Sequence, residues 1–113
     1  MTKPETDYSQ FAALDIRVGT ILRVAPAETR KPTWRMHIDF GPEIGERVSC
    51  GAYTNYRAEE MVGKRVIAVV NFPPRRMGPE TSEVLVLGVA APDGNGTIFL
   101  TIDKDAPDGS ETF

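Results

Sequence analysis

The sequence contains few of the residue types on which catalytic and metal sites depend. Its 113 residues include one cysteine, Cys50, and one histidine, His37. A lone cysteine forms no disulfide within the chain and no metal site with cysteine partners. A GxxxxGKS/T phosphate loop, an HExxH zinc motif and a CxxC pair are all missing, so the usual frames for phosphate and metal chemistry are absent. We therefore predict a protein that is not an enzyme and uses no metal or cofactor.

The single histidine remains the one candidate for acid–base chemistry. His37 lies between Arg35 and Asp39 on the outward side of a predicted strand, with no nucleophile beside it in the sequence. General acid–base catalysis needs a reacting group within hydrogen-bond reach, so a surface histidine or a contact in a binding groove is the favoured interpretation. Cys50 sits in a short apolar run and is interpreted as a small packed residue.

Long hydrophobic runs are also missing. No stretch approaches the roughly 18 apolar residues that a membrane span needs, and the first residues, "MTKPETDYSQ", lack the apolar segment of a signal peptide. One cysteine suits a reducing compartment. These features predict a soluble, cytoplasmic protein that does not insert into a membrane.

What the sequence does contain is typical of one globular domain over residues 1–113, with 41% hydrophobic and 26% charged residues. The net charge is only −3, but residues 17–76 hold 11 of the 13 Lys and Arg and 6 of the 16 Asp and Glu. This asymmetry indicates a basic surface with a polyanionic partner. An ordinary mixed surface is the alternative.

Two segments alternate with the period of a β-strand. In residues 16–24 one side is predicted to carry Ile16, Val18, Thr20, Leu22 and Val24, and the other Arg17, Gly19, Ile21 and Arg23. In residues 34–40 the inward side is predicted to carry Trp34, Met36, Ile38 and Phe40, and the outward side Arg35, His37 and Asp39.

The remaining segments complete an all-β pattern. Further strands are predicted at 47–52, 65–71, 83–89 and 97–102, a turn at 41–46, and short helices at 8–14 after Asp7 and at 56–62 between a cap at Asn55 and Gly63. A polar tail follows from residue 103. This order predicts a five-stranded OB-fold barrel with short helices and N- and C-terminal extensions. A β-sandwich is the alternative.

Two of the predicted strands are apolar on both sides. "RVIAVV" (65–70) and "EVLVLGV" (83–89) show no polar face, although a strand of a free barrel should be polar outside. Continuous apolar strands are covered on both sides. The cover is the N-terminal helix, the C-terminal tail or a second copy of the chain, and we favour a homodimer.

Basic residues from separate segments are predicted to meet in one groove. OB barrels commonly bind oligonucleotides on strands two and three, between the loops that join strands one to two and four to five. Arginine forks onto phosphate and stacks on bases. Solvated surface charge is the alternative for each residue taken alone. The predicted groove residues are Arg30, Lys31, Arg35, His37, Arg47, Ser49, Arg75 and Arg76.

Apolar residues of the same region suggest a different ligand. Trp34, Phe72 and Met77 lie in or near the loops, and Pro73 and Pro74 stiffen the second loop. Accessible methionine and aromatic side chains suit peptide binding, and a stiff loop loses less entropy when it binds. Packing in the core is the alternative, and it is favoured for Trp34.

Three motifs together resemble a known family. "LDIRVGTI", "IDFG" and "VVNFPPRRMGPETSEVLVLG" are similar to the tRNA-binding domain that occurs alone or attached to aminoacyl-tRNA synthetases. The segments "NFPPRR" and "SEVLVLG" most resemble the CsaA-type secretion chaperones of that family. The resemblance covers residues 8–113. One departure is the run Ser49-Cys50-Gly51, where many relatives have Ser-Gly-Leu.

The resemblance implies an OB-fold homodimer that binds tRNA by shape and backbone. For the CsaA-type branch it also implies binding of unfolded or preprotein segments in apolar pockets, linked to protein export. We expect an export-related chaperone, with a non-sequence-specific tRNA-binding module as the alternative. The expected nucleic-acid contacts are Arg17, Arg35, Ser49, Asn71, Arg75, Arg76 and Ser82, and the expected peptide contacts are Phe11, Trp34, His37, Phe72 and Met77.

Overall fold

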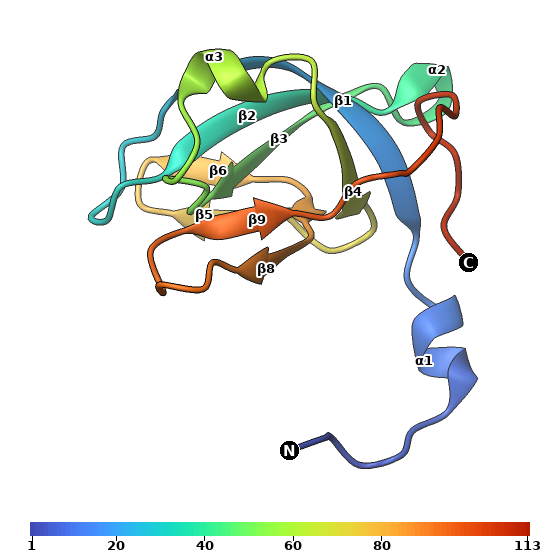
Figure 1. Ribbon diagram of the computed structural model, residues 1–113. Coiled ribbons are helices and arrows are strands. Elements are labelled where there is room, and N and C mark those ends of the chain that lie inside the picture. Colours follow the sequence, from blue (N-terminus) through green and yellow to red (C-terminus); the bar gives the residue numbers. More distant parts are fainter.

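A computed structural model describes residues 1–113 as a mostly β structure with few short helices (Figure 1). The helices are α1 (Tyr8–Ala12), α2 (Gly41–Ile44) and α3 (Ala58–Met61). The strands are β1 (Ile16–Pro26), β2 (Trp34–Asp39), β3 (Glu46–Gly51), β4 (Arg65–Val69), β5 (Arg75–Met77), β6 (Glu80–Ser82), β7 (Leu85–Val86), β8 (Gly88–Ala90) and β9 (Thr97–Phe99).

Five of these strands form a nearly closed antiparallel barrel. The main sheet has the order β3-β2-β1-β4-β7, and the segment before β7 returns to β3. There the Glu83 amide donates to the Val48 carbonyl at 2.8 Å, and the Val48 amide donates to the Glu83 carboxylate at 2.8 Å. The predicted OB-fold class is confirmed.

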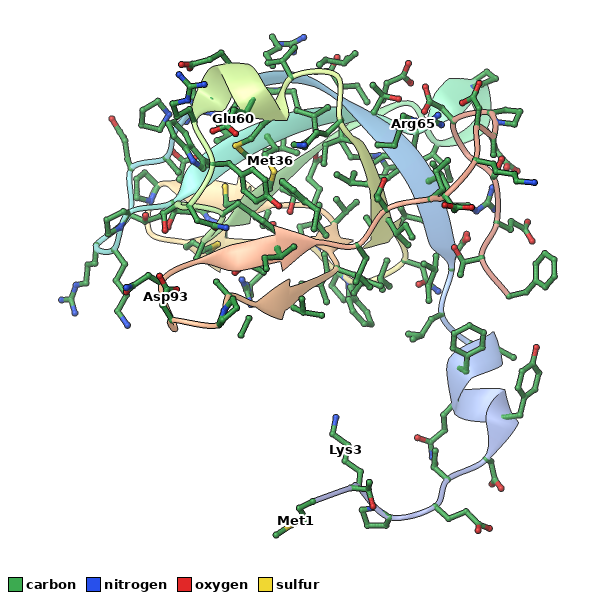
Figure 2. All side chains as sticks on the ribbon, viewed as in Figure 1. Met1, Lys3, Met36, Glu60, Arg65 and Asp93 are labelled. Atoms are coloured by element: carbon green, nitrogen blue, oxygen red, sulfur yellow. The ribbon has the colours of Figure 1, made fainter.

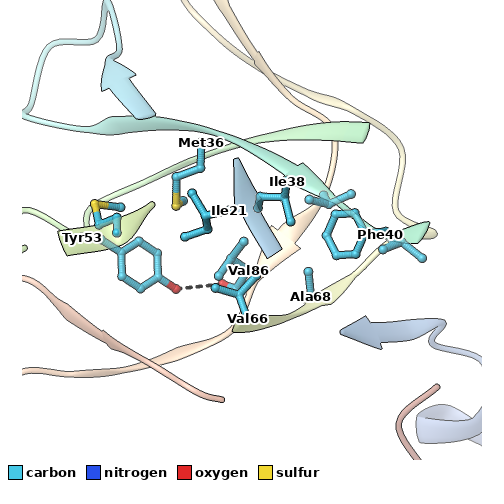
Figure 3. Close-up of a cluster of buried hydrophobic side chains, with 11 residues drawn as sticks. Ile21, Met36, Ile38, Phe40, Tyr53, Val66, Ala68 and Val86 are labelled. Carbon is cyan, nitrogen blue, oxygen red and sulfur yellow. Dashed lines mark hydrogen bonds between the residues drawn. The ribbon is translucent and has the colours of Figure 1, made fainter. Parts of the chain in front are cut away.

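The barrel encloses a cluster of buried side chains from every strand of the main sheet but one, β3 (Figure 3). The inward set predicted for β2 is confirmed: Met36, Ile38 and Phe40 are fully buried, and Trp34 packs against the cluster from its rim. The Tyr53 hydroxyl donates to the Val86 carbonyl at 3.1 Å, so the one phenol in the cluster has a partner.

A β-bulge in β1 changes which side chains enter the core. Ile21 lies opposite Ile38, but Arg23 lies opposite His37, so Leu22 is an extra residue on β1. Ile21 is 1% exposed and Leu22 is 40% exposed. The strict alternation predicted for residues 16–24 therefore holds as far as Leu22 and is wrong at Arg23 and Val24, because a bulge reverses the sides of the strand.

Gly19, on the same inward side, allows β1 and β2 to approach. A Cβ at this position would lie 2.7 Å from Cγ2 of Ile38 and 2.7 Å from the Phe40 ring. Any larger residue would therefore have to displace two core side chains.

Helices α2 and α3, of four residues each, differ from the sequence predictions. Residues 41–44, predicted as part of a turn, form the single turn of α2, and α3 begins after Arg57 rather than near Asn55. The Asn55 side chain instead accepts a hydrogen bond from the Thr97 amide at 3.0 Å. No helix in the structure has both the length and the apolar character to cross a membrane.

The C-terminal tail pairs with the first half of β1. Residues 109–112 pair with the edge of β1 through three backbone hydrogen bonds of 2.8–3.0 Å. Arg65, labelled in Figure 2, holds the preceding residues by donating to Asp105 at 2.6 Å and Asp108 at 3.2 Å. Ile16, Val18 and Val69 are buried.

The rest of the predicted apolar cover is not supplied by this chain. The predicted strand 83–89 is divided between β7 and β8, and its outer residues Leu85 and Val89 stay exposed. Helix α1 stands away from the barrel (Figure 1) and has no buried residue. The tail therefore pairs with β1 and binds Arg65 of β4, whereas the outer apolar residues of β7 and β8 stay uncovered within this chain.

The bulge predicts that truncation of Ile21 destabilises the fold much more than truncation of its neighbour Leu22. Ile21→Ala should lower the free energy of unfolding by about 2–5 kcal/mol, because it leaves a cavity in the core. Leu22→Ala should change it by at most about 0.5 kcal/mol, because that side chain faces solvent. Urea denaturation measures both, and a larger loss at Leu22 would contradict the observed register.

Candidate nucleic-acid and peptide interface

The predicted loop between barrel strands four and five contains a regular hairpin. Strands β5 and β6 pair with Arg75 opposite Ser82 and Met77 opposite Glu80. The turn is Gly78-Pro79, and Gly78 has a φ of +66°, a left-handed conformation that glycine adopts without steric cost. The proline-rich stretch therefore ends in a rigid, hydrogen-bonded element.

The pairing separates the two adjacent arginines. Side chains alternate along a strand, so Arg75 and Met77 share one side of β5 and Arg76 lies on the other. Arg75 and Met77 line the largest cavity of the structure, whereas Arg76 lines none and donates only to the Gly78 carbonyl at 3.5 Å. The prediction that both arginines face one groove is wrong for Arg76.

We call this largest cavity the basic groove. Its volume is about 660 Å³, and it lies between the β1–β2 connection and the β5–β6 hairpin. Its floor is formed by residues 50–52, and its charged lining consists of Arg30, Lys31, Arg75 and Glu28. Three cations and one carboxylate thus converge from two connections that are distant in the sequence.

Glu80 joins the two sides of the basic groove from beneath. Glu80 is 7% exposed. Its carboxylate accepts hydrogen bonds from the Glu28 amide and the Arg35 guanidinium, each at 2.8 Å. The Glu28 amide, and after it the charge and hydrogen bond of Arg35, lower the pKa of Glu80, against the opposing effect of burial. Glu80 therefore carries a negative charge that Arg35 neutralises, and it adds no repulsion inside the groove.

Cys50 lies beside this ion pair, with its sulfur 3.9 Å from the Glu80 carboxylate. Burial, and then the negative charge of Glu80, raise the pKa of the Cys50 thiol. The thiol stays protonated at neutral pH, as expected for a packed residue.

The structure pairs Arg17, a predicted nucleic-acid contact, with groups of its own chain. Arg17 is 8% exposed. Its guanidinium donates hydrogen bonds to Asp15 at 2.5 Å, to Glu43 at 3.0 Å and to the Gly109 carbonyl at 3.0 Å. The hydrogen bonds that it donates to the Asp15 and Glu43 carboxylates raise the pKa of Arg17. The side chain connects the start of β1, α2 and the C-terminal tail, so its charge is already compensated.

Four other residues predicted for the groove or for nucleic-acid contacts lie elsewhere or bind within the chain. Ser49 lies opposite Met36 on the inward side of β3 and is buried, and Arg47 lies opposite Ile38, so neither accompanies Arg35 as predicted. Two more form hydrogen bonds within the chain: the buried Ser82 hydroxyl bridges the Cys50 amide and the Val84 carbonyl, and Asn71 bridges the Asp15 amide and the Ala13 carbonyl.

Neither His37 nor Trp34 lines the basic groove. The His37 ring lies on the outer side of β2, 3.2 Å from the Glu46 carboxylate and 3.3 Å from Arg23. The hydrogen bond from Arg23, and then that from His37, lower the pKa of Glu46 against the opposing effect of desolvation. Trp34 is partly buried, and its indole donates to the Tyr56 carbonyl at 3.2 Å.

A second cavity, which we call the apolar pocket, adjoins the basic groove. Its volume is about 230 Å³, and it is lined by Cys50, Phe72, Pro73, Arg75, Ser82, Glu83, Val84 and Leu85. Phe72 and Leu85 are each 43% exposed. Leu85 was missed by sequence reasoning, because the apolar pattern of its strand was attributed to a covering partner.

The five expected peptide contacts do not form one site. Phe72 lines the apolar pocket and Met77 the basic groove, whereas Trp34 lines a third cavity beside the β1–β2 connection. His37 lines none of the cavities, and Phe11 borders a separate cleft between α1 and the C-terminal residues. Only the first two lie close to Arg75.

With this geometry in place, comparison with known proteins identifies the family. The model of the "Putative tRNA binding domain" family matches residues 16–111. The chain belongs to the tRNA-binding-domain family. This tRNA-binding domain is 40% identical to the CsaA chaperone of Picrophilus torridus, with a TM-score of 0.90 and coverage of 96% of this chain and 100% of that one.

Two further comparisons refine this placement. The CsaA chaperone of Bacillus anthracis is 34% identical, with a TM-score of 0.90 and coverage of 97% of this chain and all of that one. The methionine–tRNA ligase of Methanosarcina mazei is 38% identical over 110 residues, but the tRNA-binding domain spans only 15% of the ligase. The predicted resemblance to CsaA-type members of the family is confirmed.

The lowered pKa of Glu80 predicts that the stability contributed by its ionised carboxylate is lost in acid. A lowered folded-state pKa gives stability that is complete above the unfolded value of about 4.3 and is lost as the pH falls through the folded value. Glu80→Gln should therefore unfold at lower urea than the wild type at neutral pH, and the difference should narrow as the solution is acidified below about pH 4. Glu5→Gln, at an exposed position, controls for the change in net charge. A difference that stays constant with pH would contradict an ionised anchor.

Proposed function

We propose that this tRNA-binding domain binds tRNA through the basic groove. The observation that carries the proposal is the convergence of Arg30, Lys31 and Arg75 on one open cavity of about 660 Å³. Guanidinium groups donate paired hydrogen bonds to phosphate oxygens, and a lysine ammonium adds a point charge. The groove is therefore suited to the sugar–phosphate backbone.

The same groove offers little for reading a base sequence. Phosphate contacts position a protein on nucleic acid, and contacts to base edges specify sequence. Its cationic side chains are phosphate donors, and Arg35, which does not line the groove, is paired with Glu80. We propose recognition of tRNA by shape and backbone, without catalysis, in the cytoplasm.

The separation of Arg75 and Arg76 supplies the test. Arg75→Ala should weaken tRNA binding and reduce the slope of log K against log salt by about one, because one phosphate contact and its released counterion are lost. Arg76→Ala removes the same charge from the opposite side of β5 and should change the slope clearly less. Filter binding or fluorescence anisotropy at several salt concentrations measures both.

Equal slopes for the two variants would show that the orientation of Arg75 does not matter. An absence of salt-dependent tRNA binding by the wild-type domain would contradict the proposed function itself.

A chaperone function, as a second candidate, is favoured by the apolar pocket. Phe72 and Leu85 leave apolar surface exposed beside a cavity of about 230 Å³, next to Pro73. Prolines restrict the backbone before binding, so less entropy is lost on binding. We propose that this pocket takes an apolar side chain of an unfolded or preprotein segment during protein export, and similarity to CsaA chaperones of known structure supports this.

Two substitutions of exposed apolar residues by serine, one inside and one outside the apolar pocket, test this proposal. Leu85→Ser should weaken binding of a short, uncharged, leucine-containing peptide by roughly tenfold, because burial of one such side chain contributes about 1.5–3 kcal/mol. Val89→Ser, also at an exposed apolar residue but outside the pocket, is the matched control. Peptide titration followed by anisotropy gives both affinities, and equal losses would assign the peptide to another surface.

A homodimer remains part of the proposal. A five-residue helix without buried residues is not stable by itself in water, and α1 exposes Tyr8 and Phe11 near the exposed Phe113. A second copy that packs against α1 would bury these rings. A monomer in sedimentation velocity at high concentration would contradict this arrangement.

A further inference from the structure

The basic groove and the apolar pocket share one exposed side chain. Only Arg75 and Cys50 line both cavities, and Cys50 is buried. The wall that a ligand meets between the two sites is therefore Arg75. This inference rests on the proposed function, in which the two sites take different ligands.

Arg75 is not fixed by the protein. Its one side-chain hydrogen bond goes to the Met77 sulfur at 3.7 Å, which is a weak acceptor. Arg17, Arg35 and Arg65 are by contrast each paired with carboxylates. A long, exposed and unpaired arginine changes rotamer rapidly, so its position responds to whichever ligand is bound.

The strand beneath Arg75 cannot move with it. The hairpin is held at Glu80 by the Glu28 amide and Arg35, and at Ser82 by the Cys50 amide. If tRNA and peptide both contact the Arg75 guanidinium, the side chain therefore adjusts by changing its rotamer, and the backbone stays in place. We therefore expect the two sites to keep their separation when either ligand binds.

We propose that Arg75 makes binding of tRNA and binding of an apolar peptide antagonistic. A guanidinium that is turned onto a phosphate in the basic groove withdraws its aliphatic stem from the wall of the apolar pocket. A peptide side chain in the pocket packs on that stem and holds the guanidinium away from the phosphate. The domain then exchanges one ligand for the other.

Thermodynamic linkage gives this proposal a quantitative form. If bound tRNA weakens peptide binding by some factor, bound peptide weakens tRNA binding by the same factor. The contact at issue is one side chain, so we expect a factor of about 5–20, within the usual range of coupling between sites.

The experiment uses the full chain, an unmodified tRNA transcript and a short peptide of leucine, serine and glycine with a neutral dye. The absence of charge on the peptide removes direct electrostatic competition with the transcript. Peptide affinity is measured without tRNA and with saturating tRNA, and tRNA affinity without and with saturating peptide. The wild type should show the same 5–20-fold loss in both directions.

Substitutions at the two arginines separate this mechanism from simple overlap. Arg75→Ala should weaken each ligand alone but bring the coupling factor close to one, whereas Arg76→Ala should retain the wild-type factor. Arg75→Lys keeps the stem and the charge, so it should retain part of the coupling and also provides a readout if Arg75→Ala no longer binds tRNA. Circular dichroism and urea midpoints confirm that each variant is folded.

Each alternative outcome has a distinct meaning. Independent binding of the two ligands to the wild type would overturn the antagonism but leave the proposed function intact. Full antagonism in Arg75→Ala would show that the ligands themselves overlap and would overturn the role of Arg75. Failure of the wild type to bind either ligand would overturn the proposed function and this inference together.

Discussion

One buried carboxylate determines the shape of the candidate interface. Glu80 accepts hydrogen bonds from the Glu28 amide in the β1–β2 connection and from Arg35 in β2, each at 2.8 Å, while its own strand carries the hairpin. Three elements that are distant in the sequence are therefore held at one point. A buried charge with these donors is stable, but it would be costly if any of them were removed. The width of the basic groove depends on this anchor.

Five of the nine arginines fall into two groups with different roles. Arg17, Arg35 and Arg65 are paired with carboxylates and hold strands, helix α2 and the tail in place. Arg30 and Arg75 line the basic groove. A count of basic residues along the sequence overstates the positive charge that a ligand meets, because carboxylates of the protein neutralise part of that charge. The accessible charge is smaller, and it is gathered in one place.

The fold was more predictable from the sequence than the site. Alternation and glycine–proline turns indicate an OB-fold barrel, since these patterns report directly on burial, although they do not reveal the bulge at Leu22. The site depends on which partner each polar side chain finds across the fold, and sequence spacing contains no such information. Arg17 and Ser82 look like ligand contacts for this reason but are bound to the protein itself. The opposite orientations of Arg75 and Arg76 follow from hairpin pairing, which was not predicted within the proline-rich stretch.

The pairing of the C-terminal tail with β1 has a consequence for how the chain folds during synthesis. Arg17 lies opposite Glu111, so the edge of the first strand stays open until almost all of these residues have left the ribosome. An open strand edge is a template for pairing with other chains, and contacts between distant residues form slowly. The nascent barrel is therefore exposed to aggregation for most of its synthesis, and a truncation before residue 109 would make that exposure permanent.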